Sequence, residues 1–318
     1  MKYHVSQDTV AELEQVILSD RPFVAAAVQS NRFISRGSYL LWRLVNPHAL
    51  ESKDLVRSNW IGKKSRKGNH HFFSVLMGPD FQKCFPYFLL SGRKSIYMFD
   101  AFPSKHKIIE RFLNSFNPEH VFLSSSQAVH MLQALTGKFN FSWIPEAISP
   151  ELYTQYPYSS KDIDVLALGR KYDAHHDRIV AALEMDRRNY LYEKAKGVII
   201  FPTREEFING LARTKISICV PSSTTSPDRA GSLETMTIRY LQSMISKCLV
   251  LGHAPKEMIG LFGYNPVVEI DMENPVLQIR SLLDHFTDYI PLIEKNFAIV
   301  VEEHTWRRRW EKITGILK

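Results

Sequence analysis

Short apolar runs alternate with helical segments along this chain of 318 residues, and this rhythm limits its fold more than any other feature. Strands that alternate with helices form right-handed βαβ units around a parallel sheet. In the first half, four runs have the length and apolar character of buried strands, namely 71–77, 95–100, 120–124 and 141–145. The segments 104–116 and 125–137 between them are typical of helices. We therefore predict an α/β protein.

The same rhythm resumes after residues 145–162, a segment rich in proline, serine and tyrosine that we interpret as a linker. Expected strands there are 163–169, 197–201, 215–221, 248–252 and 265–270, with helices over 175–186 and 203–214. Thr203 and Glu206 have the spacing of a capping box. We expect two Rossmann-like domains, residues 1–148 and 149–318. Near the N-terminus, 9–18 is typical of a helix and 37–46 of a buried helix or strand.

Composition limits the class of protein further. Apolar residues make up 45% of the chain, enough for sizeable cores, and the net charge of +7 favours acidic partners such as nucleotides. Cys84, Cys219 and Cys248 lie far apart without a CxxC pair, which is typical of free thiols in a reducing compartment. There is no signal-peptide pattern and no apolar run of about 18 residues, so we expect a soluble cytoplasmic protein.

The residues that directly follow the predicted strands are the first candidates for function, because ligands bind beyond the carboxyl ends of parallel strands. Gly169, Arg170 and Lys171 follow the strand 163–169. A glycine allows a ligand to approach the backbone, and two adjacent cations suit a diphosphate. A surface turn with solvated charges is the alternative.

A hydroxyl-rich loop, 221–234, follows another predicted strand and leads straight into a helix within the stretch 233–252. The first N–H groups of a helix favour an anion, and Thr235 or Thr237 is the expected cap. Arg239 adds donors for phosphate, and Gln242 lies three residues later on the same face, where an amide suits a ribose hydroxyl. The pattern predicts a cradle for a nucleoside diphosphate. A core helix with a solvated polar end is the alternative.

Several other chemistries lack their sequence signatures. No GxGxxG follows a predicted strand and no GxxxxGK[ST] loop occurs, which argues against a dinucleotide dehydrogenase and a P-loop kinase. The histidine pairs 70–71 and 175–176 lack metal-ligand spacing, so we expect no metal site.

Four segments of the second half share a pattern with one known family. They are WIP (143–145) before DVLALGR (164–170), CVPS (219–222), IRYLQSMISKCLVLG (238–252) and EEHTWRRRWEKI (302–313). Over residues 140–318 the chain resembles the donor-binding domain of GT-B glycosyltransferases, of the spore-maturation type and of the type that builds capsule or lipopolysaccharide.

The resemblance implies a GT-B fold, in which two Rossmann-like domains face a central cleft. It implies transfer of a sugar from a nucleoside-diphosphate sugar to a glycan or lipid-linked acceptor, in cell-surface polysaccharide synthesis. Ser222 then lies at the donor, and Glu234 takes the place of a glutamate near the donor sugar. The family usually has a glutamate that binds ribose where this chain has Gln242, which implies an altered nucleotide preference.

The mechanism that the resemblance implies needs fixed positive charge for the leaving nucleoside diphosphate. Arg170, Lys171 and Arg239 are the candidates, with Arg178 and Arg229 as weaker ones, and neither a metal nor another cofactor is expected. Asp100 ends the strand 95–100 and is the candidate base for the acceptor hydroxyl, with a cap or turn residue as the alternative.

Two basic segments, the loop 61–71 and Arg307–Arg309, suit an anionic membrane surface, with a solvated helix face above a packed tryptophan as the alternative. We expect no nucleic-acid partner, because no such module is recognisable. An inactive GT-B-like protein that binds a nucleotide sugar or glycan, and a sugar-nucleotide epimerase, are the rival functions.

Overall fold

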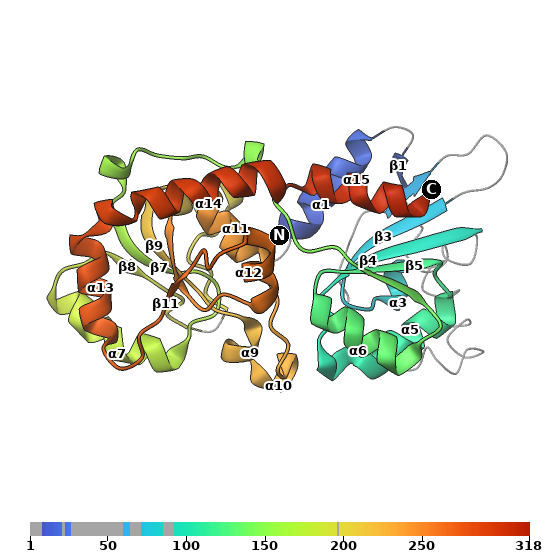
Figure 1. The fold of residues 1–318 in the computed structure, drawn as a ribbon, viewed down its shortest axis with the longest axis horizontal. Coiled ribbons are helices and arrows are strands. Elements are labelled where there is room, and N and C mark those ends of the chain that lie inside the picture. The colour runs from blue at the N-terminus through green and yellow to red at the C-terminus, as the bar shows by residue number, and fades with distance from the viewer. Residues whose placement is uncertain (1–7, 21–22, 27–59, 64–70, 85–91, 196) are drawn as a thin grey trace. The chain divides into compact units, whose positions relative to one another are not determined.

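The computed structural model describes residues 8–20, 23–26, 60–63, 71–84, 92–195 and 197–318 (Figure 1). The chain forms two compact units, each with its own sheet and core. Unit 1 comprises Met1–Thr9, Glu146–Pro227 and Glu234–Arg308, and unit 2 comprises Val10–Pro145, Asp228–Leu233 and Arg309–Lys318. The expected domains were 1–148 and 149–318. In the structure, 228–233 and 309–318 belong to the unit of the first half, and 1–9 belongs to the unit of the second half.

Unit 2 is built on a sheet whose order within the described residues is β1-β2-β3-β4-β5-β6. The strands are β1 (Phe23–Ala26), β2 (Trp60–Lys63), β3 (His71–Met77), β4 (Arg93–Phe99), β5 (His120–Leu123) and β6 (Asn140–Trp143). β3 to β6 are parallel, whereas β1 and β2 are antiparallel additions at one edge. The four strands predicted for this half are confirmed.

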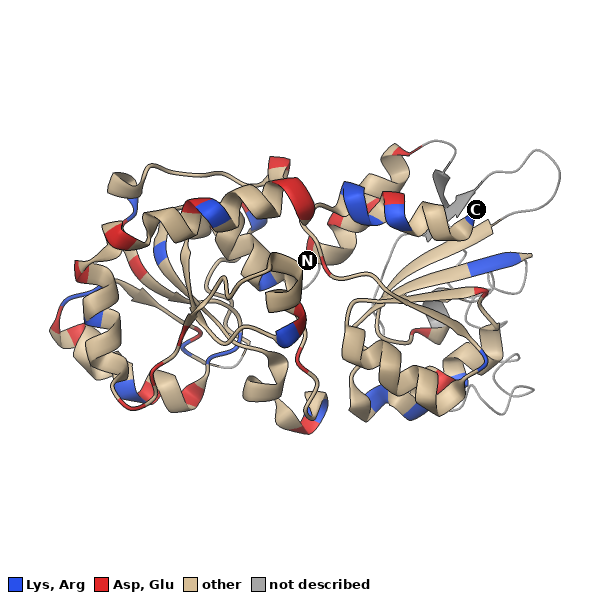
Figure 2. Cartoon of the chain, viewed as in Figure 1, with Lys and Arg blue, Asp and Glu red and all other residues tan. Residues whose placement is uncertain are grey.

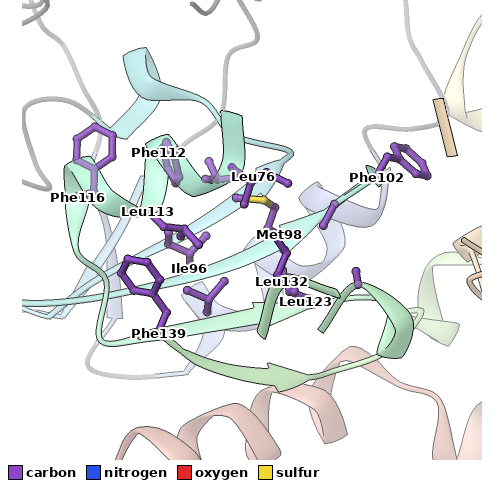
Figure 3. Packing of buried hydrophobic residues seen from close by; sticks show 14 of the residues in the cluster. Leu76, Ile96, Met98, Phe102, Phe112, Leu113, Phe116, Leu123, Leu132 and Phe139 are labelled. Carbon is purple, nitrogen blue, oxygen red and sulfur yellow. The ribbon is translucent and has the colours of Figure 1, made fainter. Parts of the chain in front are cut away.

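Helices α5 (His106–Phe116) and α6 (Ser126–Thr136) lie along one face of this sheet (Figure 1). In α5, the residues Ile109, Phe112, Leu113 and Phe116 recur at helical spacing and are all buried, which gives the helix its apolar face. Figure 3 shows Phe112, Leu113 and Phe116 of this face in the same cluster as Leu76, Ile96 and Met98 from the strands. The core of unit 2 therefore lies between the sheet and these helices.

Unit 2 also contains α3 (Phe81–Cys84), the 3₁₀ turn η3 (Pro103–Lys105) and α1 (Asp8–Ser19), whose first two residues belong to unit 1. The helix expected over 9–18 is thus confirmed, while the prediction for 37–46 lies outside the described residues. The C-terminal helix α15 (Trp306–Leu317) enters this unit at Arg309. Its Trp310 packs edge-on against Phe73 at 5.2 Å and donates to Asp20 at 2.7 Å.

Unit 1 is built on a parallel sheet whose order within the described residues is β11-β10-β9-β7-β8. The strands are β7 (Ile163–Ala167), β8 (Tyr190–Leu191), β9 (Thr214–Cys219), β10 (Leu249–Gly252) and β11 (Val268–Glu269). The helices are α7 (Asp173–Met185), α8 (Arg204–Ala212), α11 (Ile238–Ile245), α12 (Lys256–Phe262), α13 (Pro275–Asp284) and α14 (Ile290–Glu303), with short turns η4 (Pro150–Leu152), η5 (Tyr158–Ser160), α9 (Ser222–Thr225) and η6 (Phe286–Tyr289).

One strand prediction in unit 1 is wrong. Residues 197–201 form turns and bends, and the edge strand β8 lies earlier in the chain. The apolar side chains of this segment do not mark a strand. Val198 is exposed, whereas Phe201 packs against Gly210 of α8, where an added Cβ would lie 2.2 Å from the Phe201 ring. Periodicity reports which side chains are apolar, and it does not report whether a neighbouring strand is present.

Two local predictions concern helix starts, and they have different outcomes. Thr203 and Glu206 form the expected capping box at the start of α8. The helix that carries Arg239 begins at Ile238, so Thr237 stands at the expected N-cap position, but its side chain makes no capping hydrogen bond. Just before it, Glu257 accepts hydrogen bonds from the Thr235 hydroxyl at 2.7 Å and from the Met236 N–H at 2.8 Å. Cys84, Cys219 and Cys248 are all free and buried, as predicted.

Candidate functional site

The carboxyl ends of β7 and β9 mark the point where the strand order of unit 1 reverses. These strands are neighbours, yet the chain leaves β7 toward β8 on one side and leaves β9 toward β10 on the other. The loops after such a pair diverge and leave a crevice, which is where open parallel sheets bind ligands. Here those loops are 168–172 and 220–237.

Arg239 joins the two loops. From the first turn of α11, its Nη1 donates to the Leu168 carbonyl at 3.0 Å, just beyond β7. Gly169 has φ +83°, and a Cβ there would lie 2.7 Å from the same nitrogen. Two features therefore favour glycine at this position: its left-handed backbone and the guanidinium packed against it.

Arg170 makes a second link between the loops. Its Nη1 donates to the Ser226 hydroxyl at 2.5 Å, so the loop after β7 also contacts the loop after β9. Lys171 points elsewhere: its Nζ lies 4.0 Å from Asp173 and 5.5 Å from the ring centre of Tyr192. Of the three predicted cations, Arg170 and Arg239 flank Gly169, and Lys171 lies at the margin.

Carboxylates already bind N–H groups at the start of α11. Glu146, which is 6% exposed, accepts from the Ile238 N–H at 2.8 Å, and Glu257 accepts from Met236. Thr237 is the N-cap residue, but its side chain makes no capping hydrogen bond. The expectation that free N–H groups here would receive a phosphate is therefore wrong for Ile238, since a protein carboxylate stabilises the helix start. The guanidinium groups of Arg170 and Arg239 are then the charged donors of these loops that suit an anion.

Gln242 lies in the core of unit 1. It is fully buried, and its amide nitrogen donates to the Tyr153 hydroxyl at 3.0 Å and to the Asp8 carboxylate at 3.3 Å. Asp8 is also buried and lies 3.7 Å from Arg204. Gln242 is thus 0% exposed in this structure, and its contact with a ribose stays a prediction.

The other two predicted donor contacts lie in the segment between β9 and α11. Ser222 begins α9 and is buried, and Glu234 is half-buried in the irregular segment before α11. Glu234 therefore lies in a loop rather than on the helix that carries Arg239.

Asp100 belongs to unit 2 and directly follows β4. It has φ +51°, a left-handed conformation that Asp tolerates in turns, which agrees with the turn-residue alternative. Its Oδ2 lies 3.0 Å from Nη2 of Arg229. The carboxylate is thus engaged by a guanidinium, and its role as a base stays a prediction.

A group of rings beside the crevice was not predicted. His175 stacks on Tyr172 at 6.4 Å, Tyr172 meets His253 edge-on at 6.3 Å, and His253 bonds Glu269 at 2.9 Å. Burial, together with the positive charge of His253 and other neighbours, lowers the pKa of His175 to about 4. The adjacent histidines at 175 and 176 were visible in the sequence, but the loops that surround them were not.

The described residues contain no group of three or more His, Cys, Asp or Glu side chains that could hold a metal ion. Within the same residues, no helix is long and apolar enough to cross a membrane. Several helices of both units carry basic and acidic residues together, among them α5, α7 and α13 (Figure 2). On α15, Arg308 pairs with Glu303 and Trp310 is buried, as the solvated-face alternative predicts, while most of the basic loop 61–71 lies outside the described residues.

Comparison with known proteins finds similarity in structure alone. No protein-family model matches the chain, and no curated protein sequence does. The solved structure of TarM is 12% identical over 76% of this chain and 54% of TarM, with a TM-score of 0.51. A variant of S. aureus TarM, in complex with fondaparinux, alpha-GlcNAc-glycerol and UDP, has a TM-score of 0.53 at 11% identity, again over 76% of this chain and 54% of that one.

Sucrose-phosphate synthase from Thermosynechococcus elongatus is 10% identical, with a TM-score of 0.50 over 77% of this chain and 72% of that one. The chain spans about half the length of TarM. The fold is therefore the GT-B fold of glycosyltransferases, as the sequence predicted.

Proposed function

We propose that this protein is a glycosyltransferase that binds the diphosphate of a nucleoside-diphosphate sugar at the carboxyl ends of β7 and β9. The observation that carries the proposal is a pair of guanidinium groups at the topological switch point: Arg239 lies against Gly169 and bonds the Leu168 carbonyl, and Arg170 bonds Ser226 of the loop after β9. Guanidinium forks suit phosphate oxygens, and the missing Cβ of Gly169 gives the Arg239 guanidinium room to lie against the loop after β7. The UDP bound in the TarM complex supports a nucleoside diphosphate as the ligand class.

In the proposed reaction the bond between the sugar and the diphosphate breaks, and negative charge grows on the leaving nucleoside diphosphate. Arg170 and Arg239 stabilise that charge from fixed positions, with Lys171 as a third cation at the margin. Ser222 and Glu234 are the proposed contacts to the donor sugar. We propose that these cations act without a metal ion, so that activity is unchanged after treatment with EDTA.

The acceptor is proposed to be a glycan or a lipid-linked sugar in cell-surface polysaccharide synthesis, with the enzyme in the cytoplasm. The resemblance of the segments at 143–145, 219–222 and 238–252 to such enzymes supports this choice. Asp100 is the proposed candidate to deprotonate the acceptor hydroxyl. If a nucleotide sugar binds without turnover, the protein is a binding protein of the same fold. If it is converted to its epimer without an acceptor, the protein is an epimerase.

The first test is a thermal-shift panel with UDP, GDP, CMP, ADP and dTDP, followed by titration of the nucleotide that stabilises the protein. A ligand at a hundred times its dissociation constant adds about 2.7 kcal/mol of stability, which such an assay detects. Replacing Arg239→Ala is expected to weaken binding about 10- to 100-fold, because a charge-assisted hydrogen bond is worth about 1.5–3 kcal/mol. Arg239→Lys should recover part of the loss, since it keeps the charge without the fork.

The matched control is Arg280→Ala, which removes an arginine of similar partial exposure that pairs with Asp186 elsewhere in unit 1. It should leave nucleotide binding unchanged. A protein stabilised by none of the five nucleotides, or an Arg239→Ala variant that binds as tightly as the parent, would contradict the proposed function.

A further inference from the structure

A histidine paired with a carboxylate stands at the carboxyl end of β10, and the proposed function gives it no role. His253 directly follows β10, and its backbone N–H donates to the carbonyl of Cys219, the last residue of β9, at 3.3 Å. Its ring meets that of Tyr172, in the loop after β7, edge-on at 6.3 Å between ring centres. His253 therefore lies beside the two strands whose ends define the crevice, and all these residues belong to unit 1.

Contacts on both the ring and the backbone fix the position of this imidazole. Nδ1 of His253 lies 2.9 Å from Oε2 of Glu269 in β11, and the His253 carbonyl accepts from the Tyr240 hydroxyl at 2.7 Å. Glu269 is held in turn, because its Oε1 accepts from Nδ2 of Asn265 at 3.1 Å and from the Ala254 N–H at 3.4 Å. The protein itself thus orients the ring, as a preorganised binding residue requires.

The carboxylate decides which ring nitrogen is left for a ligand. An ionised carboxylate only accepts hydrogen bonds, so Nδ1 of His253 carries a proton, and in the neutral ring Nε2 is then an acceptor. Among the residues that the structure describes, none forms a hydrogen bond with Nε2, and the side chain is 36% exposed. An oriented hydrogen-bond acceptor therefore stands beside a crevice whose charged donors are Arg170 and Arg239.

Hydroxyl groups are the part of a sugar nucleotide that suits such an acceptor. Phosphate oxygens are acceptors themselves and match the guanidinium groups, whereas a hydroxyl of the ribose or of the sugar can donate to Nε2. His175 also stacks on Tyr172, but it is only 1% exposed. Of these two histidines, His253 is the one that is exposed to a ligand.

We propose that Nε2 of His253 accepts a hydrogen bond from a hydroxyl group of the bound sugar nucleotide, and that Glu269 is the positioning residue that keeps the proton on Nδ1. This inference rests on the proposed function and deepens it. Arg170 and Arg239 bind the diphosphate, and His253 binds a hydroxyl of the ribose or of the sugar attached to it. Asp100 keeps its proposed role as the base for the hydroxyl of the acceptor substrate.

The test compares ligands with and without hydroxyl groups in the variant His253→Asn. The Asn amide can still donate to Glu269, so this variant keeps the pairing and loses the acceptor. Dissociation constants are measured by calorimetry at about pH 8, where imidazole side chains are ordinarily neutral. The ligands are the nucleotide that stabilises the parent protein, its sugar conjugate (UDP and UDP-glucose, for example) and inorganic pyrophosphate, which has no sugar hydroxyl.

His253→Asn is expected to weaken binding of a ligand that carries the contacted hydroxyl about three- to tenfold, the usual range for a neutral hydrogen bond, and to leave pyrophosphate binding unchanged. Weaker binding of both the nucleotide and its conjugate assigns the contact to the ribose. Weaker binding of the conjugate alone assigns it to the sugar.

Two further variants and a control sharpen this result. His253→Gln can place an amide oxygen near the former Nε2 and should recover part of the lost affinity. Glu269→Gln removes the charge that keeps the proton on Nδ1 and should weaken the same ligand by a smaller factor, which serves if His253→Asn does not fold. The matched control is His285→Asn, which changes an exposed histidine of unit 1 that bonds the Ser281 carbonyl, and it should leave all three constants unchanged.

Unchanged binding of both the nucleotide and its conjugate in His253→Asn overturns the inference. An equal loss for pyrophosphate also overturns it, because the variant would then disturb the diphosphate site. If Arg239→Ala weakens nucleotide binding and His253→Asn does not, the proposed function stands and only the role of His253 fails. If the parent protein binds none of these ligands, both fail.

Discussion

Two polar side chains of helix α11, one on its first turn and one in its middle, lie in opposite surroundings. Arg239, on the first turn, is half-buried and reaches the loop after β7 at the edge of the sheet. Gln242 lies three residues later on the same face, yet it is fully buried and bonded to Asp8 and Tyr153. A helix rises about 1.5 Å per residue, so about 4.5 Å of depth separates the two backbone positions. Only the first turn of this helix reaches the crevice.

The largest expected effect comes from replacing the buried Gln242 by the glutamate that the family usually has at this position. Gln242→Glu places a second carboxylate beside Asp8, where the amide nitrogen now lies 3.3 Å from Oδ2. Two like charges in a buried site disfavour each other's ionised forms, so we expect a loss of stability on the order of 4 kcal/mol at pH 7. Urea unfolding of the variant and the parent measures it.

A second substitution tests whether repulsion from Asp8 causes the loss of stability in Gln242→Glu. Asp8→Asn combined with Gln242→Glu removes one of the two charges and should restore most of the stability. If Gln242→Glu instead folds normally and binds nucleotide more tightly, position 242 contacts the ligand. The contrast drawn between Arg239 and the buried Gln242 is then wrong.

The next effect concerns pH and the ring cluster beside the crevice. His175 has a pKa lowered to about 4 by burial, against about 6.5 in an unfolded chain, so the unfolded state binds the extra proton first. Its contribution to stability is fully present above about pH 6.5 and is lost as pH falls toward 4. The loss is at most about 3 kcal/mol, since each pKa unit is worth about 1.4 kcal/mol.

Replacement by phenylalanine isolates this contribution, because His175→Phe keeps a ring against Tyr172 and removes the titration. Stability measured between pH 4 and 7 should fall less steeply in the variant than in the parent. Parallel curves would show that the imidazole is not protonated on unfolding in this range.

A smaller effect on stability and binding is expected from Gly169, which lies against the Arg239 guanidinium. Gly169→Ala adds a Cβ at φ +83°, which costs about 1–2 kcal/mol, and places it 2.7 Å from Nη1 of Arg239. We expect lower stability together with weaker nucleotide binding. Gly263→Ala is the matched control, since it has φ +75° and nothing within 4 Å of the added atom, and it should lose stability with binding intact.

The smallest effect is expected at the start of α8, a helix end that is not part of the proposed nucleotide site. Thr203→Ala removes the capping box of α8 and should cost about 1 kcal/mol, with nucleotide binding unchanged. Thr203→Ser retains the hydroxyl and should recover most of that stability in the same thermal unfolding experiment. A loss of binding in Thr203→Ala would mean that α8 supports the crevice.

Local patterns predicted most of the fold and only part of the candidate site. Apolar runs marked β3 to β7 and β9 to β11, because buried parallel strands are apolar on both faces, whereas β1, β2 and β8 were not predicted. The capping box of α8 was also visible, since its two residues lie three apart. Residues 197–201 were misassigned because pairing depends on a neighbour that the run itself does not encode.

The residues that decide the candidate site are held by partners distant in sequence. Asp8 and Gln242 are 234 residues apart, and Glu146 bonds a backbone N–H that lies 92 residues later. No periodicity reports such contacts, so the burial of Gln242 and the occupied N–H of Ile238 were out of reach. By contrast, Gly169 and Arg170 directly follow a strand, and that position alone predicted their place at the crevice.

The exchange of short segments between the units decides how this protein can be divided. A fragment that starts at residue 149 would lack Asp8 and Glu146, leaving Gln242 without one partner and the start of α11 without its carboxylate. It would also keep Arg309–Lys318 without Phe73 and Asp20, which would expose Trp310 to water. Dissection of this chain into independently folding halves is therefore expected to yield aggregation-prone pieces.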